Sequence, residues 1–286
     1  MMSRSKALGF VACALALAGS ILTAQSADSK QKITFLDGPT NAPLGSMASI
    51  NVPAGFRFID GKTTRALLKA EGEPVSDSIL GLMAPTNADW SVMFEFAGIG
   101  YVKDDDKDKL DADKLLASIK AGTEAANKER QRNGNPPLEV VGWEVPPKYD
   151  AATHNLEWAV RATCEGRPIL NYNTRLLGRK GVMEVVLIVK PDMLGDTLPT
   201  FREMLAGYSY QSGQTYAEYR SGDKLAKYGL GALVVGGAAV GAAKLGLFTA
   251  LAVFLKKGWK LVVLAFAGIA SFFKKLFTGR SKKKSE

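Results

Sequence analysis

Residues 138–190 read LEVVGWEVPPKYDAATHNLEWAVRATCEGRPILNYNTRLLGRKGVMEVVLIVK. The stretch is rich in β-branched and aromatic residues, and turn formers interrupt it at a Pro-Pro pair, at Gly166 and at the glycines of GRKG. It predicts four strands with turns at those interruptions. The strands are expected over residues 138–150, 155–164, 169–178 and 181–190. Strands joined by such short connections pair antiparallel, because parallel neighbours need a longer crossover.

The flanking sequence completes an α+β domain. Apolar alternations predict further strands over residues 48–53, 56–59 and 91–102. Apolar residues at helical spacing predict a helix over residues 110–134, which Asp111 or Asp113 can cap and Gly134 can end, and a last helix over residues 192–207. The expected fold class is therefore α+β, with one mostly antiparallel sheet and helices packed on it.

The net positive charge of the chain comes from its two ends. The formal net charge is +9, but residues 27–224 carry 24 Lys and Arg against 27 Asp and Glu. Residues 225–286 carry 11 basic residues against Glu286 alone. An acidic body argues against a nucleic-acid partner, and a basic tail indicates membrane topology or lipid contact.

An export signal is predicted over residues 1–26. Arg4 and Lys6 precede an apolar run, and Ala24-Gln25-Ser26 supplies the small residues of a cleavage site. Cleavage before Ala27 is preferred, with an uncleaved anchor as the alternative. The exported domain is then expected to be residues 27–224.

A transmembrane helix is predicted within residues 225–257. Gly229 to Leu255 are 27 residues with Lys244 as the one charge, and about 40 Å of helix can cross a hydrocarbon core of about 30 Å with tilt. Residues 258–286 hold a second, shorter apolar run that suits an interfacial amphipathic helix or a short transmembrane helix, and then a basic cytoplasmic tail. One crossing is favoured over two, because it keeps all the lysine clusters in the cytoplasm.

A stripe of three residues marks one side of this predicted span. Gly237 and Gly241 form a GxxxG pair, and Lys244 follows at helical spacing. Small residues let a second helix approach closely, so the stripe is a candidate for helix packing and for a homo-oligomer. Lys244 is expected to extend toward the membrane surface or to make a polar contact across such an interface.

Several segments resemble a known family. They include PPKYDAATHNLEWA at 146–159, YNTRLLGRKG at 172–181 and YGLGALVVGGAAVGAAKLGLF at 228–248. On these segments the chain is similar to domain-of-unknown-function family 2167, over nearly all of residues 33–255. The resemblance implies a bacterial envelope protein with an exported domain and a C-terminal anchor, and it brings no catalytic residues. A looser likeness to exported sandwich domains of the Mog1/PsbP kind concerns topology alone.

The catalytic candidates are few. His154 is the one histidine of the chain, and Asp150 lies four residues before it, so the pair is a weak candidate for a general base and its orienting carboxylate. A single histidine argues against a His-based metal site, and no cofactor motif is present. Arg175 and Arg179, with the nearby Tyr172, are weak candidates for gripping a carboxylate or phosphate, and ion pairing within the acidic body is the alternative.

Together with what the resemblance implies, the sequence predicts a bacterial inner-membrane protein whose main domain is periplasmic. Its expected partners are the lipid bilayer, a second copy of the chain and an envelope protein, with no nucleic acid, metal or cofactor. Binding or scaffolding is favoured over enzymatic activity. An envelope hydrolase using His154 and Asp150 is one alternative, and a transport or pore accessory is another.

Overall fold

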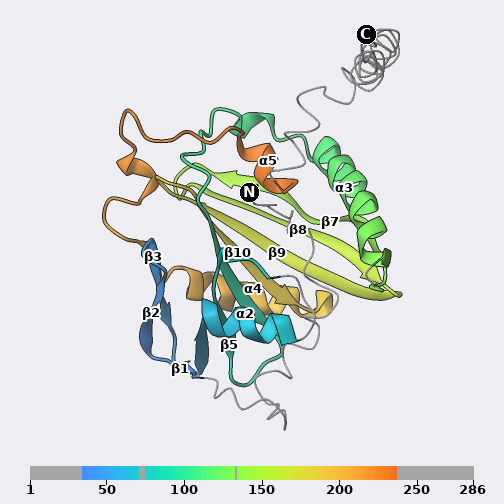
Figure 1. Cartoon of the computed structure of the whole chain (residues 1–286), viewed down its shortest axis with the longest axis horizontal. Coiled ribbons are helices and arrows are strands. Elements are labelled where there is room, and N and C mark those ends of the chain that lie inside the picture. Colours follow the sequence, from blue (N-terminus) through green and yellow to red (C-terminus); the bar gives the residue numbers. More distant parts are fainter. Residues whose placement is uncertain (1–33, 71–74, 133, 237–286) are drawn as a thin grey trace, which may run out of the picture. The chain divides into compact units, whose positions relative to one another are not determined.

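The structure, a computed structural model, describes residues 34–70, 75–132 and 134–236. Its main element is an eight-stranded antiparallel sheet with the strand order β1-β4-β5-β6-β10-β9-β8-β7 (Figure 1). A second sheet has three antiparallel strands in the order β11-β3-β2. The strands are β1 (Leu36–Asp37), β2 (Thr40–Leu44), β3 (Ala48–Val52), β4 (Phe56–Asp60), β5 (Ile79–Pro85), β6 (Ser91–Ala97), β7 (Leu138–Asp150), β8 (Asn155–Cys164), β9 (Arg167–Leu177), β10 (Val182–Val189) and β11 (Tyr208–Tyr210).

Four α-helices and three short 3-10 helices join these strands in the described part of the chain. They are α2 (Gly61–Ala70), α3 (Ala112–Arg132), α4 (Leu194–Leu205), α5 (Leu230–Val234), η2 (Lys107–Lys109), η3 (Pro191–Met193) and η4 (Tyr216–Glu218). Helix α3 begins after Asp111, whose Oδ1 accepts the backbone N–H of Lys114 at 3.1 Å, as expected of an N-cap. Asp60 caps α2 in the same way, through the N–H of Thr63.

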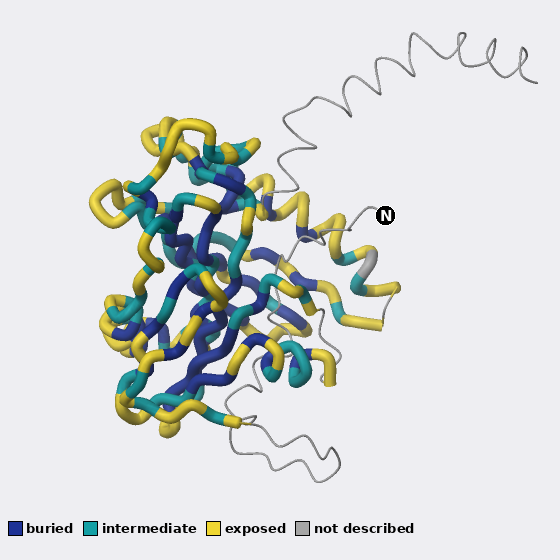
Figure 2. The backbone as a smooth tube through the Cα atoms, turned by 60° about the vertical axis from the view of Figure 1, so that its left-hand side comes forward, coloured by how far each residue is buried: buried dark blue, intermediate teal, exposed yellow. Residues whose placement is uncertain are grey.

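The large sheet is covered on both faces. One face packs against the small sheet and α4 through a core that includes Ile50 of β3, Phe94 of β6 and Phe201 of α4. The other face carries two separate clusters, one with α2 over β4 and β5, and one with α3 and α5 over β7 and β8. Figure 2 shows the buried strands inside and the exposed turns and helix faces outside.

The expected class and the four strands of the opening stretch are confirmed, but two details are wrong. The chain forms two sheets, because β3 pairs with β2 and β11 and not with the large sheet. The Pro146-Pro147 pair does not end a strand either, since β7 continues through it. The pairing of β7 with β8 shifts register between Val145 and Lys148, and an edge strand tolerates prolines at such an irregularity.

The domain extends beyond the expected boundary at residue 224. Leu230, Leu233 and Val234 of α5 are buried in the same cluster as Ile119 of α3. The backbone N–H of Leu230 donates to Asp106 Oδ1 at 3.1 Å, so a loop from the middle of the chain caps this helix. Residues 225–236, which the sequence assigned to the membrane helix, therefore belong to the folded domain.

Several expectations fall outside the described residues. These are the signal at 1–26, the span from residue 237 onward with Gly237, Gly241 and Lys244, and the helix and tail of 258–286. Within the part of the chain that the structure describes, no helix combines the length and the apolar character needed to cross a membrane.

Candidate functional site

Three ionisable side chains form a row across the middle of the large sheet. Glu184 of β10 lies directly opposite Glu95 of β6 on one side and Arg175 of β9 on the other. Directly opposed residues of antiparallel strands project from the same face, so the three side chains share the face that carries α2 and α3. We call Glu95, Glu184 and Arg175 the polar row.

Arg175 is held from two sides. Its Nη2 lies 3.1 Å from Glu184 Oε2, and its guanidinium carbon lies 4.8 Å from the ring centroid of Trp158 on β8. The residue is buried, with 8% of its surface exposed. A guanidinium stacked on an indole and paired with a carboxylate has a fixed orientation, which is how proteins present arginine to a ligand.

Glu95 occupies an unfavourable place for a charge. It is buried, and it accepts a hydrogen bond from Ser78 Oγ at 2.8 Å. Burial is the largest cause that raises the pKa of Glu95 and the charge of Glu184 raises it further, while the Ser78 hydroxyl and Arg175 act in the opposite direction. The polar row therefore combines a half-buried carboxylate, one fixed cation and one carboxyl that takes up a proton readily.

Three buried polar atoms on this face of the large sheet have no hydrogen-bond partner among the described residues. They are Arg175 Nε, Asn171 Oδ1 and Ser91 Oγ. Asn171 and Ser91 both lie opposite Ile188 of β10, in a second row on the same face of the sheet. Buried polar groups normally have partners, so a donor, an acceptor and a hydroxyl without one distinguish this face of the sheet.

The raised pKa of Glu95 makes stability depend on pH. The protonated carboxyl favours the folded state, and this contribution is complete below the ordinary pKa of a glutamate and is lost as pH rises through the raised value. Glu95→Gln is therefore expected to raise the denaturant midpoint at pH 7 to 8, with the gain shrinking toward pH 4. Equilibrium unfolding across this pH range measures it, with the exposed Glu139→Gln as control. A gain that is the same at every pH would contradict the assignment.

His154 belongs to a separate cluster at the turn between β7 and β8. Its Nδ1 lies 3.0 Å from the hydroxyl of Tyr149, and that hydroxyl donates to Asp104 Oδ2 at 3.0 Å. The imidazole also stacks on Tyr216, with ring centroids 4.2 Å apart. Burial and the neighbouring Asp104 raise the pKa of Tyr149 far above its usual value, so this phenol stays protonated and is a poor nucleophile.

Asp150 makes a hydrogen bond within its own turn. Its Oδ1 accepts the backbone N–H of Ala152 at 2.8 Å, and this hydrogen bond is the first cause that lowers the pKa of Asp150. It shapes the turn, while the carboxylate that reaches the His154–Tyr149 pair comes from Asp104. The catalytic role of His154 and Asp150 stays a prediction.

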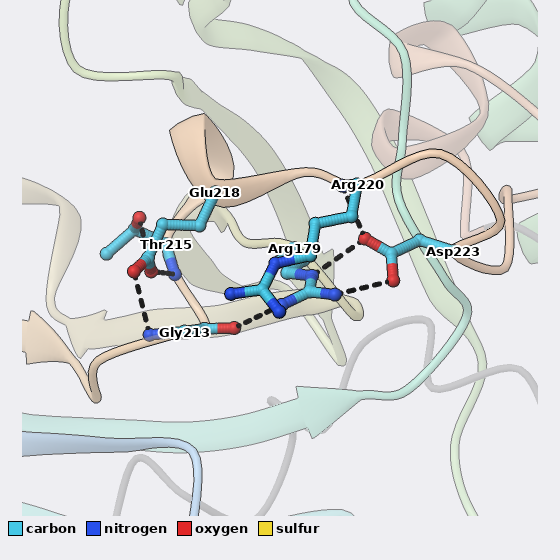
Figure 3. A network of polar contacts seen from close by, with 6 residues as sticks. All are labelled: Arg179, Gly213, Thr215, Glu218, Arg220 and Asp223. Carbon is cyan, nitrogen blue, oxygen red and sulfur yellow. Dashed lines mark hydrogen bonds and ion pairs between the residues drawn. The ribbon is translucent and has the colours of Figure 1, made fainter.

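The other three predicted site residues lie in different places. Tyr172 points to the opposite face from Arg175, where its hydroxyl donates to Glu157 at 2.6 Å and burial raises its pKa to about 12. Arg179 follows β9 and forms a bidentate pair with Asp223, at 2.7 and 2.8 Å (Figure 3). The two arginines and Tyr172 therefore do not form one ligand-binding cluster.

Figure 3 shows that Arg179 joins the β9–β10 turn to the segment before α5. Arg179 Nη1 donates to the carbonyl of Gly213 at 3.3 Å, and Glu218 closes a capping box with Thr215. The Arg179 guanidinium is the main cause that lowers the pKa of Asp223 to about 2. This network stabilises the fold, and it engages the charge of Arg179 internally.

Asp223→Asn should weaken this network in a pH-dependent way. A lowered pKa contributes stability above the ordinary value of an aspartate, and that contribution is lost as pH falls through about 2. The variant is thus expected to unfold at lower denaturant than the wild type at pH 7, with the two curves converging as the pH approaches 2. Chemical unfolding at several pH values tests this, and an unchanged gap at the lowest pH would refute it.

Sequence reasoning missed the two carboxylates of the polar row and Asp104. A signal for Glu95 was present, since it is an acidic residue within the apolar stretch SVMFEFA. Within the described residues, no three His, Cys, Asp or Glu side chains group in a way that would hold a metal ion.

Comparisons with known proteins give a family and, among solved structures, distant similarity. The family model described as "Protein of unknown function (DUF2167)" matches residues 37–267. No curated protein matches the chain. Among solved structures, the chain is similar to the solution structure of cyanobacterial PsbP (CyanoP) from Synechocystis sp. PCC 6803, with 11% identity and a TM-score of 0.38, covering 66% of this chain and 98% of that one.

Proposed function

The chain belongs to the DUF2167 family, whose function is unknown, and from that premise we propose that it is a non-enzymatic binding domain anchored at the periplasmic face of the bacterial inner membrane. In this proposal the signal at 1–26 exports the chain, the domain ends at residue 236, and an apolar helix after it holds the domain at the membrane. The domain binds an envelope partner through a polar group that enters the polar row.

The packing of α5 supports the membrane anchoring in this proposal. The helix is buried up to Val234, and Gly236 takes a left-handed φ of 85° that suits a helix end. The apolar sequence left for a span is then Gly237 to Leu255, with Lys244 as its one charge. A helix over that range measures about 28 Å, close to a hydrocarbon core of about 30 Å.

The shorter span changes the position of Lys244. It now falls close to the centre of the range 237–255 and so near the middle of the bilayer, where extension to the cytoplasmic surface is harder than for the longer span. A polar contact across a helix–helix interface is then the better explanation, on the same stripe as Gly237 and Gly241. We include a homo-oligomer through this stripe in the proposal.

Association through the stripe has a direct test. Gly237→Leu and Gly241→Leu place bulky side chains where close helix contact is needed, so each is expected to reduce the crosslinked dimer of the full chain in vesicles severalfold. Val253→Ala, on the opposite side of the predicted helix from the stripe, is the control and should change little. An undiminished dimer in both glycine variants, or a wild-type chain that is monomeric in lipid, would reject the oligomer.

Binding is favoured over hydrolysis by what surrounds the two candidate clusters. The polar row holds a stacked cation, Arg175, whose buried Nε has no partner among the described residues, and these features suit recognition of a polar group. The His154 cluster pairs the imidazole with a protonated phenol, and Asp150 is engaged by its own turn. A transport accessory would need a polar pathway, and the predicted span offers Lys244 alone.

Two measurements on bacterial cells test the proposal. Alkaline carbonate extraction should leave the full chain in the membrane, and a reporter that is active only after export should be active when fused after residue 236. A fusion after residue 224 is unsuitable, because it removes the buried residues of α5. A chain released by carbonate, or a reporter that works only in the cytoplasm, would overturn the anchoring and its sidedness.

A further inference from the structure

Two segments far apart in sequence lie side by side at the end of the domain that carries α5 (Figure 1). Tyr101 and Leu225 form a parallel bridge, in which the N–H of Tyr101 donates to the carbonyl of Lys224 at 2.8 Å. The N–H of Ala226 donates in turn to the carbonyl of Tyr101, also at 2.8 Å. The loop after β6 and the segment before α5 therefore form one continuous surface.

This surface presents apolar and aromatic side chains to the outside. Tyr101 lies between two rings, with centroids 4.4 Å from both Tyr216 and Tyr219. Tyr219 is 39% exposed and Leu225 is 44% exposed, which places both among the large hydrophobic residues that the described part of the domain leaves uncovered. A tyrosine with an apolar ring and a polar tip is well suited to the boundary between water and lipid.

The exposed charges around these residues are mostly positive. The basic side chains exposed on the two segments are Lys103, Lys107, Lys109, Arg220, Lys224 and Lys227, against the exposed Asp105, Asp108 and Asp111.

The other acidic residues here are occupied by internal partners. Asp104 accepts the Tyr149 hydroxyl, Asp106 caps α5 and Asp223 pairs with Arg179. The surface is thus positive toward the outside although the body of the chain is acidic, which matches the anionic headgroups of a bilayer.

We propose that Tyr219, Leu225 and the basic residues around them form a bilayer-docking surface, which places the domain against anionic phospholipid headgroups. The inference rests on the proposed function, because α5 packs in the same core as Tyr216 and the apolar sequence starts three residues after α5 ends. In the proposed arrangement only Val235 and Gly236 separate α5 from the membrane helix, which brings the α5 end of the domain to the bilayer, with Tyr219 and Leu225 at the interface and the lysines at the phosphates.

Photocrosslinking tests the docking surface on the full chain. A benzophenone amino acid replaces Leu225 in one sample and Leu36 in the other, and the chain is reconstituted in vesicles of phosphatidylethanolamine and phosphatidylglycerol. Leu36 is a matched control, since it is 37% exposed on β1, which lies away from α5 in Figure 1. The probe at 225 is expected to give severalfold more lipid adduct than the probe at 36.

The contribution of the basic side chains to docking is tested in the same vesicles. Lys227→Gln in the chain with the probe at 225 is expected to lower the ratio of docked to undocked domain about fivefold, the factor for one basic side chain at an anionic surface. Lys62→Gln on α2 is the control, and vesicles without phosphatidylglycerol should mimic the loss. Equal yields of lipid adduct from the probes at 225 and 36 would overturn docking. A yield at 225 that changes neither with Lys227→Gln nor with removal of phosphatidylglycerol would also overturn it.

Flotation of the vesicles in alkaline carbonate separates this inference from the proposed function. A chain that floats but gives no adduct at 225 is anchored without docking, which overturns the inference and leaves the anchoring in place. A chain that does not float overturns the anchoring, and the docking inference falls with it.

Discussion

Arg175→Ala is expected to lower the free energy of unfolding by about 3 kcal/mol, the lower end of the cost of removing one partner from a buried ion pair. The substitution leaves Glu184 without its cation, next to the buried carboxyl of Glu95. It also removes the guanidinium from the ring of Trp158. Urea unfolding of the full chain in detergent, followed by tryptophan fluorescence, measures the loss.

Two further variants test whether the loss of stability comes from the unpaired charge of Glu184. Arg57→Ala breaks an exposed pair with Asp37 and should cost less than about 1 kcal/mol. Combining Arg175→Ala with Glu184→Gln should recover part of the loss, because no unpaired charge then remains at that position. A cost for Arg175→Ala as small as that of Arg57→Ala, or a double variant no more stable than the single one, would show that the polar row is not a coupled charge network.

Leu230→Ala is expected to destabilise the domain by about 3 kcal/mol, the typical cost of truncating a fully buried leucine. Leu230 is 0% exposed and lies in the cluster that joins α5 to α3 and β8. Hydrogen exchange of α3 amides in the full chain measures the effect where the helix packs, and denaturant unfolding measures it globally.

Leu225→Ala is the matched control for Leu230→Ala. It removes the same atoms from a side chain slightly earlier in the chain that is 44% exposed, so a change within about 0.5 kcal/mol is expected. Equal small effects at both positions would mean that the domain ends near residue 224, as the sequence alone suggested, and that α5 belongs with the apolar segment that follows.

The elements that the sequence predicted well are those with a strong local pattern. Strands β8, β9 and β10 alternate between an apolar and a mixed face and have glycine at their turns, and α3 has an Asp111 cap with apolar residues at helical spacing. The separate sheet of β2, β3 and β11 was missed, because periodicity shows that a segment is extended but not which strand it pairs with. The α5 boundary was missed because LGALV is apolar both in a core and in a membrane.

The candidate site was predicted only in part for a related reason. Arg175 could be singled out as a charge in an apolar strand, but Glu95 lies far from it in the sequence and joins it through two strand pairings. His154 was singled out by its rarity, and its carboxylate partner Asp104 comes from the distant loop that follows β6. Such pairings depend on tertiary structure, which a single sequence does not contain.

The proline pair in β7 and the shortness of β1 affect whether two copies of this protein can associate edge to edge. These two strands are the outer edges of the large sheet, where open backbone donors and acceptors invite a neighbouring chain to add a strand. At the β7 edge, Pro146 and Pro147 lack the N–H that strand addition needs. At the other edge, β1 is too short to pair with an added strand. Both edges of the large sheet thus discourage the addition of a strand from a second copy.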